Sequence, residues 1–196
     1  MKLVVGLGNP GNRYDNTRHN VGFDVISRFA QMFGYSEPSK LQHKCLISSG
    51  FRSFDGQTVK ILLGKPQNFM NRSGGVISSL MAYYKLNIKD VIVVHDELAL
   101  PFGLVRCKSS GGHGGHNGLR DIIKHCGDQF LRLRFGVGPK PEGWDTAKYV
   151  LAPWTKAEQN SMSELIDYSA NILDCILSDG IESAMNRFNS GSDLRV

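Results

Sequence analysis

The side chain best suited to acid–base chemistry is His19, which lies in a long polar stretch between residues 9 and 20. An imidazole titrates near neutral pH and can therefore take a proton from water. Asn9 belongs to the same stretch, and Asp96 closely follows the apolar run at residues 91–94. A carboxylate fixes the imidazole tautomer and supports its charged form, and an amide can orient water or donate to a developing oxyanion. These residue types together indicate a general-base site that activates water.

Each of these polar residues also has a structural interpretation. His19 can be an exposed loop histidine, and Asp96 can cap the turn after its strand. Asn71 and Asn117 each precede an apolar helical pattern and can be helix caps. Either asparagine can cap a helix and still bind a substrate, because one amide has several hydrogen-bonding positions.

Two other kinds of site are only weakly indicated. His113 and His116 could bind a metal ion together with Asp96, but His-x-x-His in a glycine-rich loop is a weak pattern. The glycines at positions 6, 8 and 11 have the spacing of a dinucleotide-binding fingerprint. Pro10 interrupts that turn, however, and the helix that should open directly begins about nine residues later. No Gly-x-Ser-x-Gly motif is present, so a serine nucleophile is not indicated.

The excess positive charge is confined to one part of the chain. Of 196 residues, 41% are hydrophobic and 21% are charged, which is ordinary for one soluble globular domain. The net charge is +5, and residues 102–140 alone hold seven Lys/Arg against two Asp/Glu. A basic segment on a neutral scaffold indicates a polyanionic partner, although a solvated basic face would have the same composition.

Cysteine spacing and hydropathy predict a cytoplasmic protein. Four widely spaced cysteines without a Cys-x-x-Cys pair suit a reducing compartment better than a disulfide framework. No apolar run reaches the length of a membrane span, and the N-terminus lacks the pattern of a signal peptide. We therefore expect no membrane association.

The apolar periodicity predicts alternating strands and helices, and hence an α/β fold. We expect a single-domain three-layer sandwich, with a mixed central β-sheet flanked by helices, over residues 1–188. A polar tail that we expect to be disordered follows at 189–196. The apolar strand at 91–94 suits the centre of a parallel sheet and delivers Asp96 at its carboxyl end, where α/β sheets bind ligands. The predicted strands are 3–5, 43–49, 51–54, 58–63, 91–94, 103–108 and 130–138, with a tight turn at Asp55-Gly56. The predicted helices are 20–33, one capped by Asn71 or Ser73 and running to Tyr84, 119–126 capped by Asn117, 156–178 and 181–188.

Five motifs, in order, resemble those of bacterial-type peptidyl-tRNA hydrolases over about residues 3–188. The motifs are Gly-Leu-Gly-Asn-Pro-Gly, Tyr-x-x-Thr-Arg-His-Asn-x-Gly, Phe-Met-Asn-x-Ser-Gly, His-Asp-Glu-Leu and Gly-Gly-His-Gly-Gly-His-Asn-Gly-Leu-Arg-Asp. The resemblance implies a single α/β domain that cleaves the ester between a peptide and the 3′ ribose of tRNA. Such an enzyme recycles tRNA after stalled or aborted translation.

The resemblance also implies roles for individual residues. His19 corresponds to the catalytic histidine, Asp96 to its partner carboxylate, and Asn9 to an amide that assists catalysis. The implied substrate-binding residues are Tyr14, Asn68, Phe69, Met70, Asn71, His113 and Asn117. The residues implied to bind the 5′ phosphate of tRNA are Arg106, Lys108 and Arg134.

No cofactor, metal or covalent intermediate is implied, and we expect a monomer. Two alternatives stay open at this point. One is a non-catalytic RNA-binding relative of the same fold, which would bind RNA without turnover. The other is a nucleotide-dependent oxidoreductase, which a cofactor titration would reveal.

Overall fold

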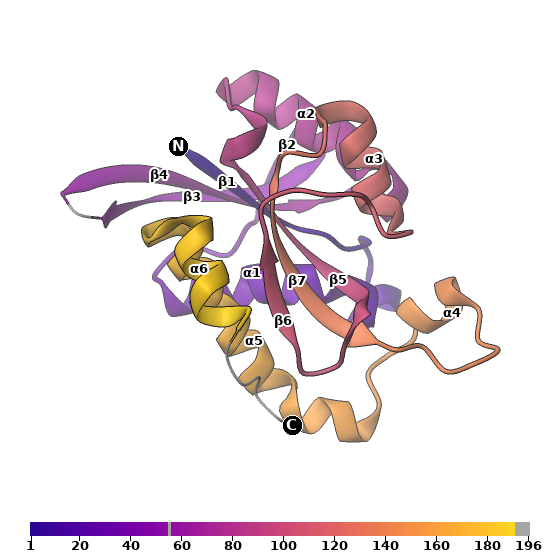
Figure 1. The fold of residues 1–196 in the computed structure, drawn as a ribbon. Coiled ribbons are helices and arrows are strands. Elements are labelled where there is room, and N and C mark those ends of the chain that lie inside the picture. Colours follow the sequence, from indigo (N-terminus) through magenta and orange to yellow (C-terminus); the bar gives the residue numbers. More distant parts are fainter. Residues whose placement is uncertain (55, 191–196) are drawn as a thin grey trace.

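The computed structural model describes residues 1–54 and 56–190, which build one mixed β-sheet with helices on both faces (Figure 1). The strand order is β2-β3-β4-β1-β5-β7-β6. The four central strands β4, β1, β5 and β7 are parallel, and β3, β2 and β6 are added antiparallel at the edges. Their bounds are β1 (Lys2–Gly6), β2 (Lys40–Gln42), β3 (Cys45–Phe54), β4 (Gln57–Pro66), β5 (Val91–Pro101), β6 (Val105–Lys108) and β7 (Leu131–Gly138).

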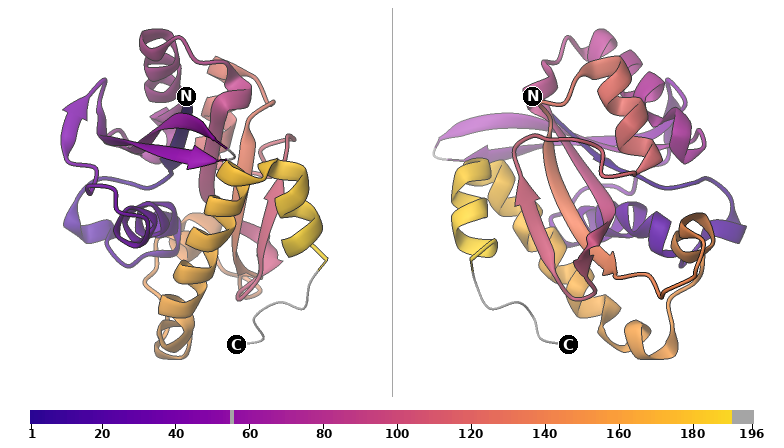
Figure 2. Two further views of the ribbon diagram at one scale, coloured as in Figure 1. Left: turned by 90° about the vertical axis from the view of Figure 1, so that its left-hand side faces the viewer. Right: turned by 45° about the vertical axis from the view of Figure 1, so that its right-hand side comes forward.

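The helices form the two outer layers of the sandwich. Helices α1 and α5 cover one face of the sheet, α2 and α3 cover the other, and α6 packs beside β6 (Figures 1 and 2). The bounds are α1 (Val21–Met32), α2 (Ser73–Tyr84), α3 (Asn117–Cys126), α4 (Thr146–Val150), α5 (Lys156–Ser178) and α6 (Gly180–Phe188). The predicted three-layer α/β sandwich is confirmed. None of these helices combines the length and the apolar character needed to cross a membrane.

Alternate residues of the central strands pack in two separate hydrophobic cores, one on each face of the sheet. Val4 packs in the core beneath α1 and α5, whereas Leu3 and Val5 pack in the core beneath α2 and α3. The run Val91 to Val94 is buried on both faces, as its unbroken apolar sequence predicts. Each large aliphatic side chain buried in this way contributes about 1.5–3 kcal/mol to folding.

Several element boundaries differ from the predicted ones for reasons of strand pairing. β5 runs on to Pro101 because β7 pairs with it beyond the point where β1 ends. The two strands predicted over residues 43–54 are one continuous strand, β3, because β4 pairs along its whole length. Strand β2 and helix α4 were not predicted, since the first is three residues long and the second five.

The predicted cap of α2 is wrong. The helix begins after Arg72, and neither Asn71 nor Ser73 accepts a hydrogen bond from its first turn. Instead, the carboxylate of Asp121 on α3 accepts a hydrogen bond of 2.7 Å from the backbone nitrogen of Gly74. A neighbouring helix therefore satisfies an orphan N–H that the local sequence leaves open.

Two predicted features extend beyond the described residues. Asp55 of the predicted tight turn lies outside them, although Gly56 has the positive φ of 78° that such a turn requires. Residues 191–196 of the predicted tail also lie outside them. Asn189 is described, and its side-chain amide accepts from the nitrogen of Cys107 at 2.8 Å and donates to its carbonyl at 2.9 Å. This pair of hydrogen bonds satisfies part of the exposed edge of β6.

Close backbone contact between α1 and the sheet fixes the position of the polar stretch that precedes α1. A Cβ atom on Gly6 would lie 2.1 Å from the carbonyl oxygen of Gly22, and one on Gly22 would lie 2.6 Å from that of Val94. Glycine is therefore required on both sides of this crossing. Because α1 begins only at Val21, these glycines serve helix–strand packing and do not form the phosphate-binding turn of a dinucleotide fold.

Candidate active site

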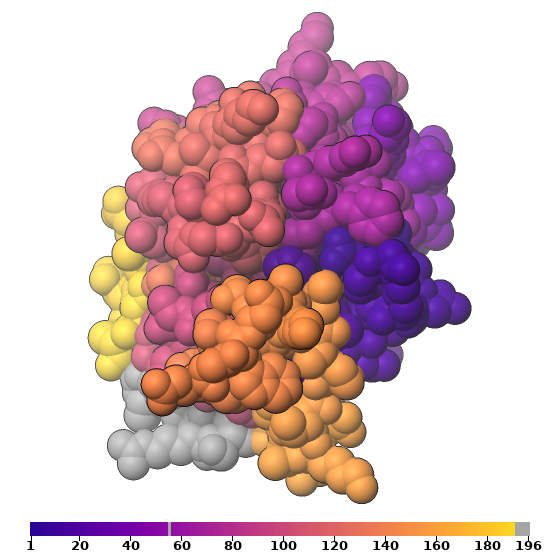
Figure 3. Space-filling model, turned by 90° about the vertical axis from the view of Figure 1, so that its right-hand side faces the viewer, coloured from indigo at the N-terminus to yellow at the C-terminus, as the bar shows by residue number. Residues whose placement is uncertain are grey.

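A cleft of about 620 Å³ opens at the carboxyl ends of β1 and β5. Figure 3 shows the surface where four segments surround this hollow: the indigo N-terminal stretch, the magenta segment before α2, the salmon glycine-rich loop and the orange region of α4. The residues lining the cleft include Asn9, His19, Phe69, Met70, Asn71, Asp96, Glu97, Leu98, Gly114, Gly115, His116, Asn117 and Asp145. Parallel strands place ligand sites at this edge of a sheet.

His19 and Asp96 form a direct pair at the base of the cleft. The Nδ1 atom of His19 lies 2.9 Å and 3.0 Å from the two carboxylate oxygens of Asp96. An ionised carboxylate only accepts hydrogen bonds, so Nδ1 carries the proton and Nε2 keeps its lone pair. The side chain of His19 is 11% exposed and that of Asp96 is 2% exposed. His19 is thus an oriented base with its free nitrogen at the edge of solvent.

His116 is a second imidazole on the same carboxylate. Its Nε2 lies 2.9 Å from Oδ1 of Asp96. Its Nδ1 accepts hydrogen bonds from the backbone nitrogens of Gly118 and Leu119, at 3.1 Å and 3.3 Å. His116 is therefore the N-cap of α3, and the predicted cap Asn117 is wrong. Capping uses a lone pair on Nδ1, so the hydrogen bond to Asp96 is donated by Nε2.

Burial and mutual contact shift the pKa values of this cluster. Burial by itself would lower the pKa of His19, but the charge of Asp96 and its hydrogen bond outweigh burial and raise that pKa. Burial would raise the pKa of Asp96, yet the two imidazole partners hold it well below its usual value. His95, packed edge-on against His116, has its pKa lowered to about 3, chiefly by complete burial and by the neighbouring His116. Asp96 is accordingly the charged centre and His95 stays neutral.

Asn9 is held in place by a hydrogen-bond network within the protein. Its Oδ1 accepts from the backbone nitrogen of Met70 at 2.8 Å. Its backbone nitrogen donates to Oδ1 of Asn20 at 2.9 Å, and Nδ2 of Asn20 returns a hydrogen bond to the carbonyl of Asn9. The network leaves Nδ2 of Asn9 as the group it can offer to a ligand in the cleft.

The turn that carries His19 is anchored to the C-terminal half of the chain by Arg18. This buried guanidinium donates to the carbonyls of Ala152 and Pro153 at 3.3 Å and 2.9 Å, and to Glu158 at 2.6 Å. It also stacks over the ring of Tyr149 at 4.5 Å. Fixing Arg18 from several directions fixes the backbone of the next residue, the base itself.

The predicted substrate-binding residues fall into two groups. Four of them, Phe69, Met70, Asn71 and Asn117, line the cleft. Tyr14 packs edge-on against Phe69 at a ring separation of 6.4 Å and extends the apolar wall beside the cleft.

The structure does not bring the other two predicted residues into the cleft lining. Asn68 lines a separate, smaller cavity together with His43 and Ser79. His113 uses its Nδ1 within the glycine-rich loop, where it accepts from the backbone nitrogen of Gly115 at 3.0 Å. No contact of these two residues with the base or its carboxylate partner is found in the described part of the chain.

The predicted phosphate-binding cations lie next to the cleft, on strands β6 and β7. A cavity of about 510 Å³ is lined by Lys108, Arg132 and Arg134 together with the carboxylate of Glu97. Glu97, Leu98 and Gly114 line both this cavity and the cleft, so the two are adjoining. Arg106 does not line the cavity; its Nη1 donates to the carbonyl of Phe188 at 3.1 Å.

The trio of potential metal ligands differs from the one considered from the sequence. In the described residues, His19, Asp96 and His116 place ligand atoms within 4.8 Å of one another, and His113 is not part of the group. Both imidazole nitrogens that face Asp96 lie at hydrogen-bonding distance from it. A metal ion in their midst would have to displace both of these protons.

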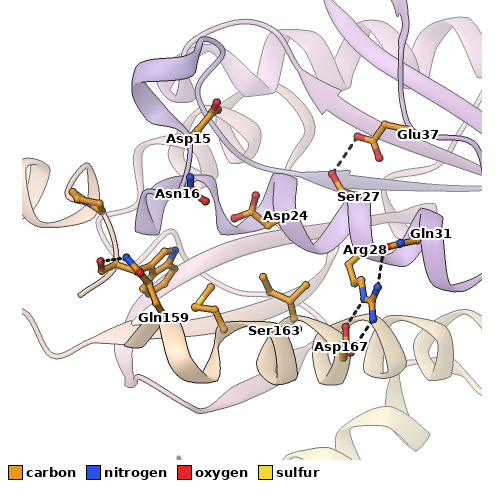
Figure 4. A pocket seen from close by; sticks show the side chains of 14 residues that line it. Asp15, Asn16, Asp24, Ser27, Arg28, Gln31, Glu37, Gln159, Ser163 and Asp167 are labelled. Carbon is orange, nitrogen blue, oxygen red and sulfur yellow. Dashed lines mark hydrogen bonds and ion pairs between the residues drawn. The ribbon is translucent and has the colours of Figure 1, made fainter. Parts of the chain in front are cut away.

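A cavity of about 1040 Å³, larger than the cleft, has none of the predicted site residues in its lining. It lies between α1 and α5, and the Arg28–Asp167 ion pair closes one part of it (Figure 4). Asp24 faces this cavity, and burial together with the charge of Asp15 raises its pKa to about 6, against the opposing influence of Lys65. The cavity lacks an imidazole or an oriented nucleophile, so the smaller cleft is the better candidate for hydrolytic chemistry.

Sequence reasoning missed two residues that the structure ties to the cleft. The sequence indicates His116 as a polar residue of the glycine-rich loop and as a weak metal ligand, but a histidine directly before a helix can also cap it. The sequence shows Arg132 as one more cation of the basic segment, whereas in the structure its side chain is buried against the glycine-rich loop. The alternating pattern of β7 places Arg132 and Arg134 on one face but does not distinguish their depth.

The chain is similar to known proteins over nearly its whole length. A family model described as peptidyl-tRNA hydrolase matches residues 3–195. A protein named peptidyl-tRNA hydrolase from Syntrophotalea carbinolica is 45% identical over 192 residues, covering 97% of each chain. One of the same name from Lachnospira eligens is 43% identical over 190 residues, covering 96% of this chain and 100% of the relative. The crystal structure of peptidyl-tRNA hydrolase from Acinetobacter baumannii has a TM-score of 0.85 at 35% identity, covering 97% of this chain and 95% of that one.

Proposed function

The chain belongs to the peptidyl-tRNA hydrolase family, and we propose that it performs the family's reaction with His19 as the general base. The reaction is hydrolysis of the ester that joins a peptide to the 3′ ribose of tRNA. The relatives reported above are named as peptidyl-tRNA hydrolases, and none of those names indicates a non-catalytic RNA-binding protein or an oxidoreductase. A cytoplasmic location and a monomeric state stay predictions from the sequence.

The observation that carries the proposal is the contact of Nδ1 of His19 with both oxygens of Asp96. In the proposed step, Nε2 takes a proton from a water molecule as the water oxygen attacks the ester carbonyl. Asp96 stabilises the imidazolium that forms. Collapse of the tetrahedral intermediate expels the 3′ oxygen of the ribose, which receives the proton from Nε2. Free tRNA and the peptide acid are the products.

Amide groups at the cleft support the positioning of substrate and the developing charge. Nδ2 of Asn9 is directed by a fixed network and can donate to the substrate carbonyl without reorganisation. Asn117 also lines the cleft, where its amide can bind the peptide. Phe69, which is 48% exposed, and Met70 offer apolar surface to a peptide side chain or a terminal base.

The adjoining basic cavity supports binding of a tRNA phosphate. Lys108 and Arg134 line it, and Nε of Arg134 is buried without a hydrogen-bond partner in the described structure. A phosphate oxygen is a suitable partner for a guanidinium. We assign the direct phosphate contacts to Lys108 and Arg134, and we give Arg106 a smaller part because it contacts α6.

Replacing Lys108 or Arg134 by alanine is expected to raise KM for peptidyl-tRNA with little change in kcat. Each loss should also lower the salt slope of tRNA binding by about one unit, because one phosphate contact is removed. The measurement is steady-state kinetics at several salt concentrations, beside a short peptidyl ester that lacks the tRNA body. An equal loss on the short ester would show that these cations act on chemistry or folding.

The activity itself is tested by following ester cleavage of peptidyl-tRNA before and after dialysis against a chelator. We expect unchanged kcat/KM, because the proposed mechanism uses only His19 and Asp96 to activate water. Loss of activity on chelation, with recovery on adding Zn²⁺, would instead assign His19, Asp96 and His116 to a metal site. Absence of cleavage in both samples would contradict the proposed function.

A further inference from the structure

Arg132 is a buried cation whose hydrogen bonds go to the glycine-rich loop at residues 109–116. Its side chain lies on β7 and the residue is 2% exposed. Nη1 donates to the carbonyl of Gly112 at 2.6 Å, and Nη2 donates to the carbonyl of Gly111. The guanidinium carbon stacks over the ring of Phe130 at 4.3 Å. No carboxylate forms an ion pair with Arg132 among the described residues.

A buried guanidinium without an ion-pair partner is costly unless its donors are satisfied. Burial and the neighbouring Arg134 both lower the pKa of Arg132, opposed by the carboxylates of Asp128 and Glu97. The two loop carbonyls satisfy the Nη donors and account for an arginine at this position, whereas Nε has no hydrogen-bond partner among the described residues. An apolar residue would fill the same space beside Phe130 but would leave the loop unattached.

The loop has little stiffness of its own. Three of its glycines, Gly111, Gly114 and Gly115, have positive φ angles of 139°, 54° and 84°. Glycine has no Cβ to restrict the backbone, so this segment relies on hydrogen bonds to hold one conformation. Arg132 supplies two of these bonds at the start of the loop.

The far end of the loop is a compact turn that ends at the active site. The backbone nitrogen of His116 donates to the carbonyl of His113 at 2.8 Å, and that of Gly115 donates to Nδ1 of His113 at 3.0 Å. His116 in turn contacts Asp96. A shift of Gly112 is therefore carried through one turn to the imidazole that orients the catalytic carboxylate.

We propose that Arg132 is a positioning residue of the hydrolytic site, and this inference rests on the function proposed above. By holding Gly111 and Gly112, it fixes the wall shared by the phosphate cavity and the ester cleft, and so places His116 against Asp96. Arg132 lines the phosphate cavity beside Lys108 and Arg134, but both of its Nη atoms already donate to carbonyls of the loop. We therefore assign Arg132 to the loop and assign the tRNA phosphate to Lys108 and Arg134.

The test uses the full chain with Arg132→Met, which keeps the length of the side chain but removes its donors. Peptidyl-tRNA and a peptidyl ester of the trinucleotide CCA are the two substrates. We expect kcat to fall about 10- to 100-fold on both, with KM for the short ester changed less than about threefold, because misplacement of about 1 Å costs this much rate. Arg28→Gln, which removes an ion pair on α1 away from the cleft, is the matched control and should leave kcat unchanged.

A phosphate-binding role would give a different pattern. If Arg132→Met raises KM for peptidyl-tRNA and leaves kcat on the short ester unchanged, Arg132 is a tRNA contact and the inference is wrong. Arg132→Lys keeps the positive charge but not the planar guanidinium that donates to the carbonyls of Gly111 and Gly112 together, so we expect its kcat to fall as in Arg132→Met. Full kcat in Arg132→Lys would overturn the proposal even if Arg132→Met does not fold.

Two further measurements test whether Arg132 acts on the active site by positioning His116 through the loop. The double variant Arg132→Met/His116→Ala should lose no more kcat than His116→Ala alone, and additive losses would contradict the path. Hydrogen exchange at the amides of Gly115 and His116 should be faster in Arg132→Met than in wild type. Unchanged exchange rates would disprove the anchoring role. Exchange does not depend on turnover, so it decides this inference even where wild type fails to cleave peptidyl-tRNA, the result that would contradict the proposed function.

Discussion

Replacing His19 by alanine is expected to lower kcat by about 10²- to 10⁴-fold while binding of peptidyl-tRNA survives. The reason is that the nitrogen that accepts the water proton disappears, whereas the cleft walls and the basic cavity stay as they are. The methyl group of alanine leaves Asp96 bound by His116, so the buried carboxylate keeps one hydrogen-bond donor. Single-turnover kinetics with saturating enzyme measure the chemical step directly.

His125→Ala is a suitable control for the His19 variant. His125 lies on α3, its side chain is 38% exposed, and it does not line the cleft. We expect its kcat to match that of wild type. If His19→Ala instead retains kcat within a few-fold of wild type, His19 is not the base and the proposed mechanism fails.

Asp96→Asn is expected to reduce kcat severely with almost no change in melting temperature. The asparagine side chain has the same shape, and its amide can pair with both imidazoles once one of them changes tautomer. The change removes the negative charge that supports the imidazolium, and it can present an N–H to Nδ1 of His19. His19 would then carry its proton on Nε2, the nitrogen that must accept one. A loss of about 10⁴-fold is the scale that such a tautomer error causes in other hydrolases.

The pH dependence of kcat/KM is an independent test of the role of Asp96. In wild type the charge and hydrogen bond of Asp96 raise the pKa of His19, against the effect of burial. Activity needs neutral His19, so kcat/KM falls as the pH drops through that pKa. In Asp96→Asn burial acts unopposed, the pKa of His19 falls, and the acidic limb moves to lower pH. If Asp96→Asn is active and its acidic limb lies at the same pH as in wild type, Asp96 only caps a turn and does not support His19.

Much of the fold follows from local patterns in the sequence. The unbroken apolar run at residues 91–94 predicts a central strand, and Gly34 with its positive φ of 73° follows the end of α1 as expected. The position of Asp96 after that run predicts that it lies at the edge of the sheet where α/β folds bind ligands. Its pairing with His19 was implied by the family motifs and is present in the structure.

Features that depend on tertiary contacts did not follow from the sequence. The cap of α2 comes from Asp121 on another helix, and no local pattern at Asn71 reveals it. The role of His116 depends on Asp96, which lies 20 residues earlier in the chain. Asn68 and His113 carry the expected residue types but lie outside the cleft lining: Asn68 lines another cavity, and Nδ1 of His113 accepts a hydrogen bond within its own loop.

The contacts of Arg18 affect the order in which the chain can become active. His19 and Asp96 are 77 residues apart, and Arg18 reaches across 134 to 140 residues to the segment before α5 and to Glu158. Contacts that close such long loops form late in folding, because closing the loop lowers the chain entropy before the contacts can stabilise the fold. The parallel strands at the centre of the sheet can therefore assemble before the general base, His19, is fixed in position. A nascent chain that ends before Ala152 lacks all three hydrogen-bond partners of Arg18, so hydrolytic competence requires that the C-terminal half of the fold be in place.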